Sequence, residues 1–194
     1  MRPFRSCQLL LTCLLLSSLW ANPLLAAPVT YKIDPAHSTL QFSVAHLDVS
    51  RVIGRFDRLD GAFVYDAAKV DACSAQLTIS ADSVDTANAE RDQHLRSSDF
   101  FDAGQFPQIG FQSTAVSGTA SAFTLAGELT MHGVRRPISF QVKKIGEGHD
   151  PWGGYRIGFE ATATLKRSDF GMAYMLGAVG DEATLTVVIE GLKQ

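Results

Sequence analysis

Cysteine is scarce in this sequence and is concentrated near its start. Only three of the 194 residues are cysteines, and two of them, Cys7 and Cys13, lie within the first 13 positions. If this segment is removed on maturation, Cys73 remains alone, which excludes an internal disulfide. We interpret Cys73 as a small packed residue rather than a reactive thiol. The stability of the fold must then come from its secondary structure and its core.

The sequence also lacks an apolar run long enough to cross a membrane. The longest, Leu9 to Trp20, is interrupted by polar or small residues and is shorter than the roughly 20 residues that a span requires. Arg2 and Arg5 precede it, and the small residue Ala26 closes the segment. Positive start, apolar middle and small-residue exit are typical of a secretory signal peptide. We therefore predict a cleaved signal peptide at 1–26, an exported domain at 27–194 and no membrane span.

An excess of positive charge is missing as well. Losing Arg2 and Arg5 leaves 15 basic residues against 20 acidic ones, so the predicted mature chain has a net charge of −5. No run of like charge stands out. This balance argues against a nucleic-acid partner and against electrostatic docking to anionic lipid.

Alternation of apolar and polar residues dominates the chain from Thr39 onward and predicts a series of β-strands. In the first strand, Leu40, Phe42, Val44 and His46 share one face. The pair Asp60-Gly61 is expected to form a turn or bulge. The predicted strands are 39–46, 49–56, 62–65, 75–80, 109–116, 122–129, 138–145, 155–165 and 183–189.

One segment, 85–98, departs from this alternation and contains good helix formers. Asp85 or Thr86 is expected to cap it, and its acidic residues come early, as the helix dipole favours. Because it shows little apolar periodicity, we expect a short helix lying across a barrel opening. Residues 168–176 are a second, weaker candidate that Gly171 disfavours.

Eight or nine short strands with so little helix indicate a single all-β domain, either a sandwich or a barrel. A closed barrel of about eight strands either fills its interior with side chains or holds one small ligand there. Eleven phenylalanines outside the predicted signal peptide suit both outcomes. The alternation pattern alone does not choose between them.

Five stretches, taken in order, resemble the YceI-like family, also called the polyisoprenoid-binding YceI domain. The match runs from about Tyr31 to Gly191. A single stretch would be weak support, but five in the family's order are specific. The matching stretches are Asp34 to Leu47, Val49 to Phe56, Arg91 to Asp102 with Phe106-Pro107, Gly127 to Pro137, and Arg167 to Met172 with 179–182.

The resemblance implies an eight-stranded antiparallel lipocalin-like barrel with one or two short helices and an apolar lumen. It further implies a periplasmic protein that binds a polyisoprenoid or similar long-chain lipid as a carrier or store, without catalysis. A tail held in such a lumen would be stabilised by roughly 25 cal/mol per Å² of apolar surface removed from water. The candidate ligand-binding residues are Phe42, Val44, His46, Phe56, His94, Phe100, Phe111, Phe140, Phe159, Phe170, Met172 and Met175.

Four histidines fall inside the matching stretches, but their irregular spacing does not predict a metal site. We expect neither a metal nor another cofactor. His132 precedes Gly133 in a predicted tight turn, so we assign it a structural hydrogen bond. His46 is interpreted either as a contact to a ligand head group or as a satisfied core histidine.

The polar cluster from Arg91 to Arg96 leaves two alternatives open. It could be a clamp of salt bridges and caps that joins the helix to the barrel, or a polar rim that meets the head of the ligand. An enzyme acting on a lipid, with His94 as base, is the rival function, although no Gly-x-Ser-x-Gly elbow occurs. A stress-response partner of a membrane redox protein is the third hypothesis. The oligomeric state is left open, with a homodimer as one option.

Overall fold

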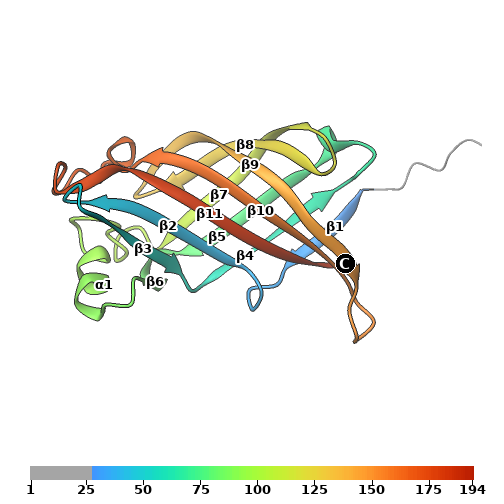
Figure 1. Ribbon diagram of the computed structural model, residues 1–194, viewed down its shortest axis with the longest axis horizontal. Coiled ribbons are helices and arrows are strands. Elements are labelled where there is room, and N and C mark those ends of the chain that lie inside the picture. The colour runs from blue at the N-terminus through green and yellow to red at the C-terminus, as the bar shows by residue number, and fades with distance from the viewer. Residues whose placement is uncertain (1–27) are drawn as a thin grey trace, which may run out of the picture.

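The computed structural model describes residues 28–194, which form a closed antiparallel β-barrel with a short helix at one end (Figure 1). The predicted signal peptide lies outside the described residues. Within 28–194, no helix is long and apolar enough to cross a bilayer. The elements are β1 (Val29–Ile33), β2 (Thr39–His46), β3 (Ser50–Phe56), β4 (Leu59–Tyr65), η1 (Val70–Ala72), β5 (Ser74–Ser80), η2 (Ala81–Ser83), β6 (Val84–Asp85), α1 (Ala89–Leu95), β7 (Gln108–Gly118), β8 (Ala122–Met131), β9 (Val134–His149), β10 (Tyr155–Lys166), η3 (Arg167–Phe170) and β11 (Val179–Lys193).

The eleven strand segments occupy eight positions around the barrel, which we call staves. Three of the eight staves are each broken into two segments. β1 and β2 both pair with β11, β4 pairs with β1, and β3 pairs with β2, so β1–β2 and β3–β4 act as two interrupted strands. β5 and the short β6 form the third interrupted stave, and β7 to β11 follow in order. The ring closes where Tyr31 of β1 pairs with Lys193 of β11. The predicted eight-stranded barrel is confirmed.

The break in the second stave lies elsewhere than the sequence predicted. Asp60-Gly61 was expected to form a turn or bulge, but both residues lie inside β4, and the interruption falls at residues 57–58. Gly61 is needed there because a Cβ would lie 2.2 Å from the carbonyl oxygen of Gln76 on β5. A close approach of two strands, rather than a turn, explains this glycine. β1 was not predicted, since its five residues are too few for a clear alternation.

α1 is shorter than expected and has a different cap. The predicted helix covered 85–98 with Asp85 or Thr86 as its cap, but it begins at Ala89 and ends at Leu95. The side chain of Asn88 accepts a hydrogen bond from the backbone N–H of Arg91 and caps it. Asp85 belongs to β6 instead.

The second predicted helix, 168–176, is only the single 3-10 turn η3. Gly171 ends this turn in the left-handed conformation, with a φ of 80°. We call the end of the barrel that carries α1 and η3 the helix end, and the opposite end, where the chain terminates, the terminus end (Figure 1).

Candidate functional site

The interior of the barrel holds a cavity of about 130 Å³ whose walls are almost wholly apolar. All eight staves contribute to it. The lining runs from Tyr65 and Cys73 near the terminus end to Met131 and Leu165 toward the helix end. It consists of Ile33, Leu40, Phe56, Phe63, Val64, Tyr65, Cys73, Ser74, Ala75, Leu77, Ile79, Ile109, Phe111, Phe123, Leu125, Leu129, Met131, Phe140, Val142, Phe159, Ala161, Leu165, Leu185, Val187 and Ile189.

Period-two alternation explains this lining. Along β11, Leu185, Val187 and Ile189 are buried while the residues between them are half-buried. Along β8, Leu129 and Met131 face the same interior. Polar groups at the wall are few, and the hydroxyl of Tyr65 is already bonded, because it donates to the carbonyl of Ala120 at 2.7 Å. An interior of this kind can hold apolar groups and offers almost nothing to a charged or strongly hydrogen-bonding ligand.

Four of the twelve predicted binding residues line this cavity: Phe56, Phe111, Phe140 and Phe159. Their rings pack edge to face with neighbours, as Phe111 does with Phe140 at a centroid distance of 5.3 Å. The alternation correctly placed these residues on the inner face. Their contact with a ligand stays a prediction.

Five further candidates are buried or half-buried at the helix end and lie outside the cavity lining: Phe42, Val44, Phe100, Phe170 and Met172. Phe42 packs against Phe56 and Phe101, and Phe56 packs against Phe101, with centroid distances between 5.3 and 6.5 Å. These three rings, which we call the plug, pack together at the helix end of the barrel. The sequence placed Phe42 and Val44 on the inner face correctly, but it could not show that this part of β2 meets a plug rather than open space.

The remaining three candidates, His46, His94 and Met175, are exposed and do not reach the cavity. The ring of His94 bonds the carboxylate of Asp99 through Nε2 at 2.8 Å and packs against Phe100 and Tyr174. The hydroxyl of Ser97 donates to the backbone carbonyl of His94, not to its imidazole. His94 therefore lies outside the lumen and has no hydroxyl nucleophile on its ring.

The polar cluster of α1 attaches the helix to the barrel, as the clamp interpretation predicted, but it does so through hydrogen bonds to hydroxyl and carbonyl groups rather than through salt bridges. The buried carboxylate of Asp92 accepts hydrogen bonds from the backbone and hydroxyl of Thr86. Arg91 donates to the hydroxyl and the carbonyl of Thr86, and Arg96 donates to the carbonyls of Asp82 and Val84. The helix buries little apolar surface, so these polar contacts are its main anchor.

Arg167, for which no role was predicted, organises the connection between η3 and β11. Arg167 is 6% exposed, and its guanidinium donates to the carbonyls of Met172, Val179 and Gly180 at 2.7 to 2.9 Å. Burial lowers the pKa of Arg167 below its ordinary value. His132 holds the same region, because its Nδ1 bonds the carbonyl of Phe170 at 2.9 Å, which confirms its predicted structural role.

Cys73 is a packed residue, as predicted, and it lines the lumen near the terminus end. The backbone N–H of Asp66 donates to its sulfur at 3.3 Å. Burial raises the pKa of the thiol, so its reactive thiolate form is disfavoured.

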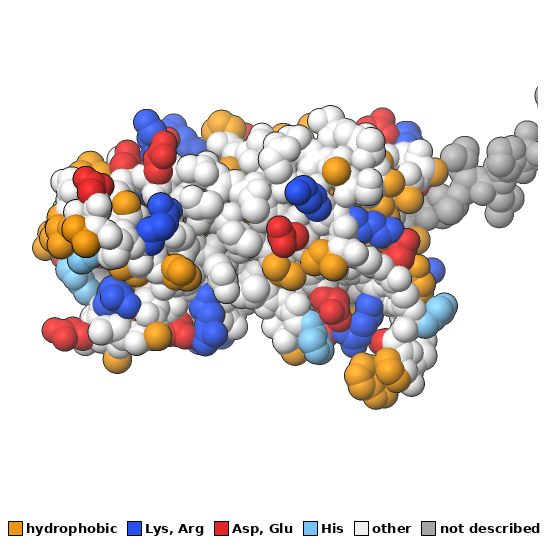
Figure 2. All heavy atoms as spheres, viewed as in Figure 1, with side chains coloured by type: hydrophobic (Ala, Val, Ile, Leu, Met, Phe, Trp, Pro, Cys, Tyr) orange, Lys and Arg blue, Asp and Glu red, His pale blue; other side chains and the backbone are white. Residues whose placement is uncertain are grey.

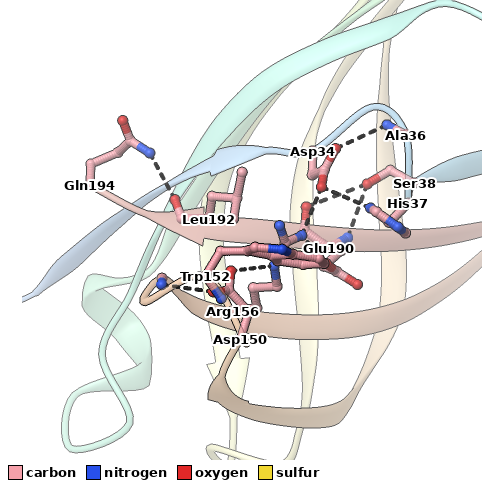
Figure 3. Close-up of polar contacts among 11 residues, drawn as sticks. Asp34, Ala36, His37, Ser38, Asp150, Trp152, Arg156, Glu190, Leu192 and Gln194 are labelled. Carbon is pink, nitrogen blue, oxygen red and sulfur yellow. Dashed lines mark hydrogen bonds and ion pairs between the residues drawn. The ribbon is translucent and has the colours of Figure 1, made fainter.

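A polar network at the terminus end ties the β1–β2 connection to β10 and β11 (Figure 3). Arg156 donates to the carboxylates of Asp34, Asp150 and Glu190, and His37 bonds Asp34 at 2.8 Å. Hydrogen bonds from His37 and Arg156 lower the pKa of Asp34 to about 2. Asp34, His37 and Glu190 bring their ligand atoms within 4.8 Å of one another. Arg156 already compensates both carboxylates, so the arrangement is that of a structural clamp.

The sequence and the barrel geometry match one family of known proteins. The sequence profile of the YceI-like domain covers residues 31–191, nearly all of the described chain. The chain belongs to the YceI-like family. Its relatives include a UPF0312 protein of Pseudomonas aeruginosa, 43% identical over 87% of this chain and 90% of the relative. A UPF0312 protein of Shewanella denitrificans is 43% identical over 93% of this chain and 98% of the relative.

Three solved structures of other proteins superpose on this barrel. A YCEI protein of Campylobacter jejuni has a TM-score of 0.71 at 28% identity, covering 77% of this chain and 90% of the other. BcnA of Burkholderia cenocepacia has a TM-score of 0.75 at 23% identity, covering 81% and 98%. A domain from Saccharophagus degradans described as polyisoprenoid-binding has a TM-score of 0.64 at 19% identity, covering 84% and 98%. The last two show the fold alone.

Proposed function

We propose that this YceI-like protein is a periplasmic binding protein for a polyisoprenoid or similar long-chain lipid, which it carries or stores. The observation that supports this proposal best is the lumen itself: a closed barrel whose interior wall is apolar on every stave and still leaves about 130 Å³ of free space. Removing an apolar chain from water into such a wall is favourable and needs few polar contacts. The polyisoprenoid-binding description of the Saccharophagus degradans domain is consistent with it.

The shape of the cavity favours a slender ligand. Its free volume is smaller than the roughly 300–1,000 Å³ of pockets that hold drug-sized molecules. The lining nevertheless extends along much of the barrel, from Tyr65 to Met131. A single extended chain can follow this path if flexible side chains such as Met131 and Leu165 change rotamer, whereas a broad ring system would have to displace the wall.

The lipid hypothesis accounts for more of the structure than the rival enzyme does. His94 lies at the surface, 45% exposed, and its ring is paired with Asp99. The titratable side chains that line the lumen are Tyr65 and Cys73, and burial raises the pKa of both, which favours their neutral forms. The lumen is therefore the site that we assign to the function.

The test is to purify the chain from Ala27 onward without detergent and to measure its native mass. We expect a discrete added mass that extracts into organic solvent as a long-chain isoprenoid lipid. Offering a C40 polyprenyl alcohol to unloaded protein should reproduce a one-to-one complex. A protein that stays unloaded and takes up no prenyl alcohol would refute the proposal, and a bound molecule that is not lipid would replace it.

A further inference from the structure

Exposed apolar side chains gather on two neighbouring connections at the helix end. Eight large hydrophobic residues are exposed in the described part of the chain, and five of them lie on the β2–β3 and η3–β11 connections, 42 to 84% exposed. Figure 2 shows apolar side chains gathered at this end of the barrel. We call this set the apolar tip. It consists of Leu47, Val49, Tyr174, Met175 and Leu176.

Two residues of the apolar tip, Leu47 and Met175, have a left-handed backbone conformation that Asn and Gly adopt more easily. Val49 N–H donates to the carbonyl of His46, and the two residues between them, Leu47 and Asp48, have φ values of 54° and 53°. Met175 has a φ of 53°. Left-handed positions of this kind favour Asn and Gly, and a large side chain there costs conformational free energy. Leu47 and Met175 are about half exposed, so packing does not compensate for that cost.

The two connections form one rigid unit. The backbone N–H of Leu47 donates to the carbonyl of Ala178 at 2.7 Å, and Ala178 N–H donates to the carbonyl of Met175. Beneath them, the buried guanidinium of Arg167 bonds the carbonyls of Met172 and Val179. Local strain that the surrounding structure holds in place is a feature of functional positions. The apolar tip is thus built to present apolar side chains to its surroundings.

We propose that the apolar tip docks onto the surface of a lipid bilayer. This proposal rests on the proposed function, because a long isoprenoid chain partitions into bilayers and must be collected from or returned to one. The tip shows aliphatic side chains together with a tyrosine, the composition that sits at the boundary between acyl chains and head groups. Asp48 lies between Leu47 and Val49, so the attraction does not depend on anionic lipid.

The size of the apolar tip disfavours a second copy of the chain as its occupant. At their observed exposures, the five residues present on the order of 500 Å². A stable protein–protein interface buries about 800 Å² on each partner, polar surface included, so a second copy would also have to cover the polar surface around the tip, whereas a bilayer needs only the apolar side chains. Two turns that project from the end of a barrel also offer no groove for a peptide.

Docking at the apolar tip would bring the plugged end of the lumen next to the bilayer. The ring of Tyr174 packs against His94 of α1 at 5.4 Å and against Phe100 at 5.6 Å. A contact that moves Tyr174 therefore acts directly on the helix and on a ring beside the plug. The docking surface and the cover of the lumen are in this way mechanically connected.

The test compares two double variants in a flotation assay with phosphatidylcholine vesicles that contain no isoprenoid. In the tip variant, Leu47→Asn with Met175→Asn removes two apolar side chains and places at both left-handed positions a residue that tolerates them. We expect at least a tenfold loss of vesicle binding with no decrease in Tm. The control, Ile145→Asn with Trp152→Asn, removes two exposed apolar residues outside the apolar tip and should bind as the unmodified protein does.

Four results would overturn the proposal: no flotation of the unmodified protein, an equal loss in both variants, binding that requires phosphatidylglycerol and disappears in salt, or a dimer that the tip variant abolishes. Because the vesicles contain no isoprenoid, these outcomes leave the lumen assignment to the native-mass measurement. A loaded protein that fails to float would refute only the docking site.

Discussion

Replacing Ala161 with phenylalanine should close the lumen without unfolding the barrel. Ala161 lies in the middle of β10, lines the cavity, and pairs with Val142 on β9 and Val187 on β11. Phenylalanine adds about 100 Å³ to this position in a close-packed interior. The cavity holds about 130 Å³. The new ring therefore takes most of the space that a ligand chain would occupy.

The energetic cost of this change should be small. Inserting a larger side chain into a filled core typically costs about 1–3 kcal/mol, but here the ring enters space that is already free. We expect a change of less than about 1 kcal/mol in the free energy of unfolding, measured by urea titration. Lipid occupancy should fall at least tenfold, measured by native mass spectrometry of protein purified in parallel with the unmodified chain.

Thr162→Phe is the matched control, because the neighbouring residue on the same strand is exposed on the outer face. It adds a similar ring to the outside of the barrel and should leave occupancy unchanged. If Ala161→Phe still carries the same lipid at the same occupancy, the lumen is not the binding site and the assignment made from its apolar wall is wrong.

Three further predictions concern stability. Arg167→Met should lower the free energy of unfolding, measured by urea titration, by about 3 kcal/mol, because three carbonyls lose their buried donor. The control is Arg135→Met, at a side chain that is 65% exposed, which should change the free energy of unfolding by under about 0.5 kcal/mol. The pKa of Asp34 is held at about 2 in the folded state, so its carboxylate stabilises the fold above the unfolded pKa and this contribution is lost as the pH falls toward 2. About 2 kcal/mol of stability should disappear between about pH 4 and pH 2, and a titration of Asp34→Asn that shows the same decline would contradict this origin. Gly127→Ala should lower Tm, since a Cβ would lie 2.5 Å from both the Phe111 ring and the Gln112 carbonyl, whereas Gly110→Ala meets nothing within 4 Å; equal Tm values for the two variants would count against the close-contact argument.

Alternation of side chains predicted the barrel well because a period of two is a local property of each strand. It placed Phe111, Phe140 and Phe159 on the inner face. Turn-forming residues located the His132-Gly133 turn, where both φ values are positive. The turn predicted at Asp60-Gly61 was wrong, because Gly61 is required by the close approach of β5 and not by a turn. The helix cap was predicted at Asp85 or Thr86, but the cap is Asn88, because Asp85 pairs in β6 and the helix begins later.

The candidate site was harder to predict, because position along the barrel is not a local property. Phe42 and Phe56 belong to neighbouring strands and both face inward, yet only Phe56 lines the cavity. Between Phe42 and the rest of the interior lies a residue from a distant part of the chain, Phe101 of the α1–β7 connection, whose ring packs against both Phe42 and Phe56. Arg167 was missed for a similar reason, since its carbonyl partners become neighbours only when the chain after η3 turns back.

The seam that closes the ring determines when a lumen can exist during folding. β1 is the first strand and β11 the last, and their pairing joins Tyr31 to Lys193. All other neighbouring staves follow one another in the chain, but the seam must close a loop that spans almost the whole domain, at an entropic cost that grows with the logarithm of its length. Ring closure is therefore a late and slow step. Until β11 has been synthesised, the inner faces of the preceding strands have no enclosed volume, so ligand capture must follow the synthesis of β11.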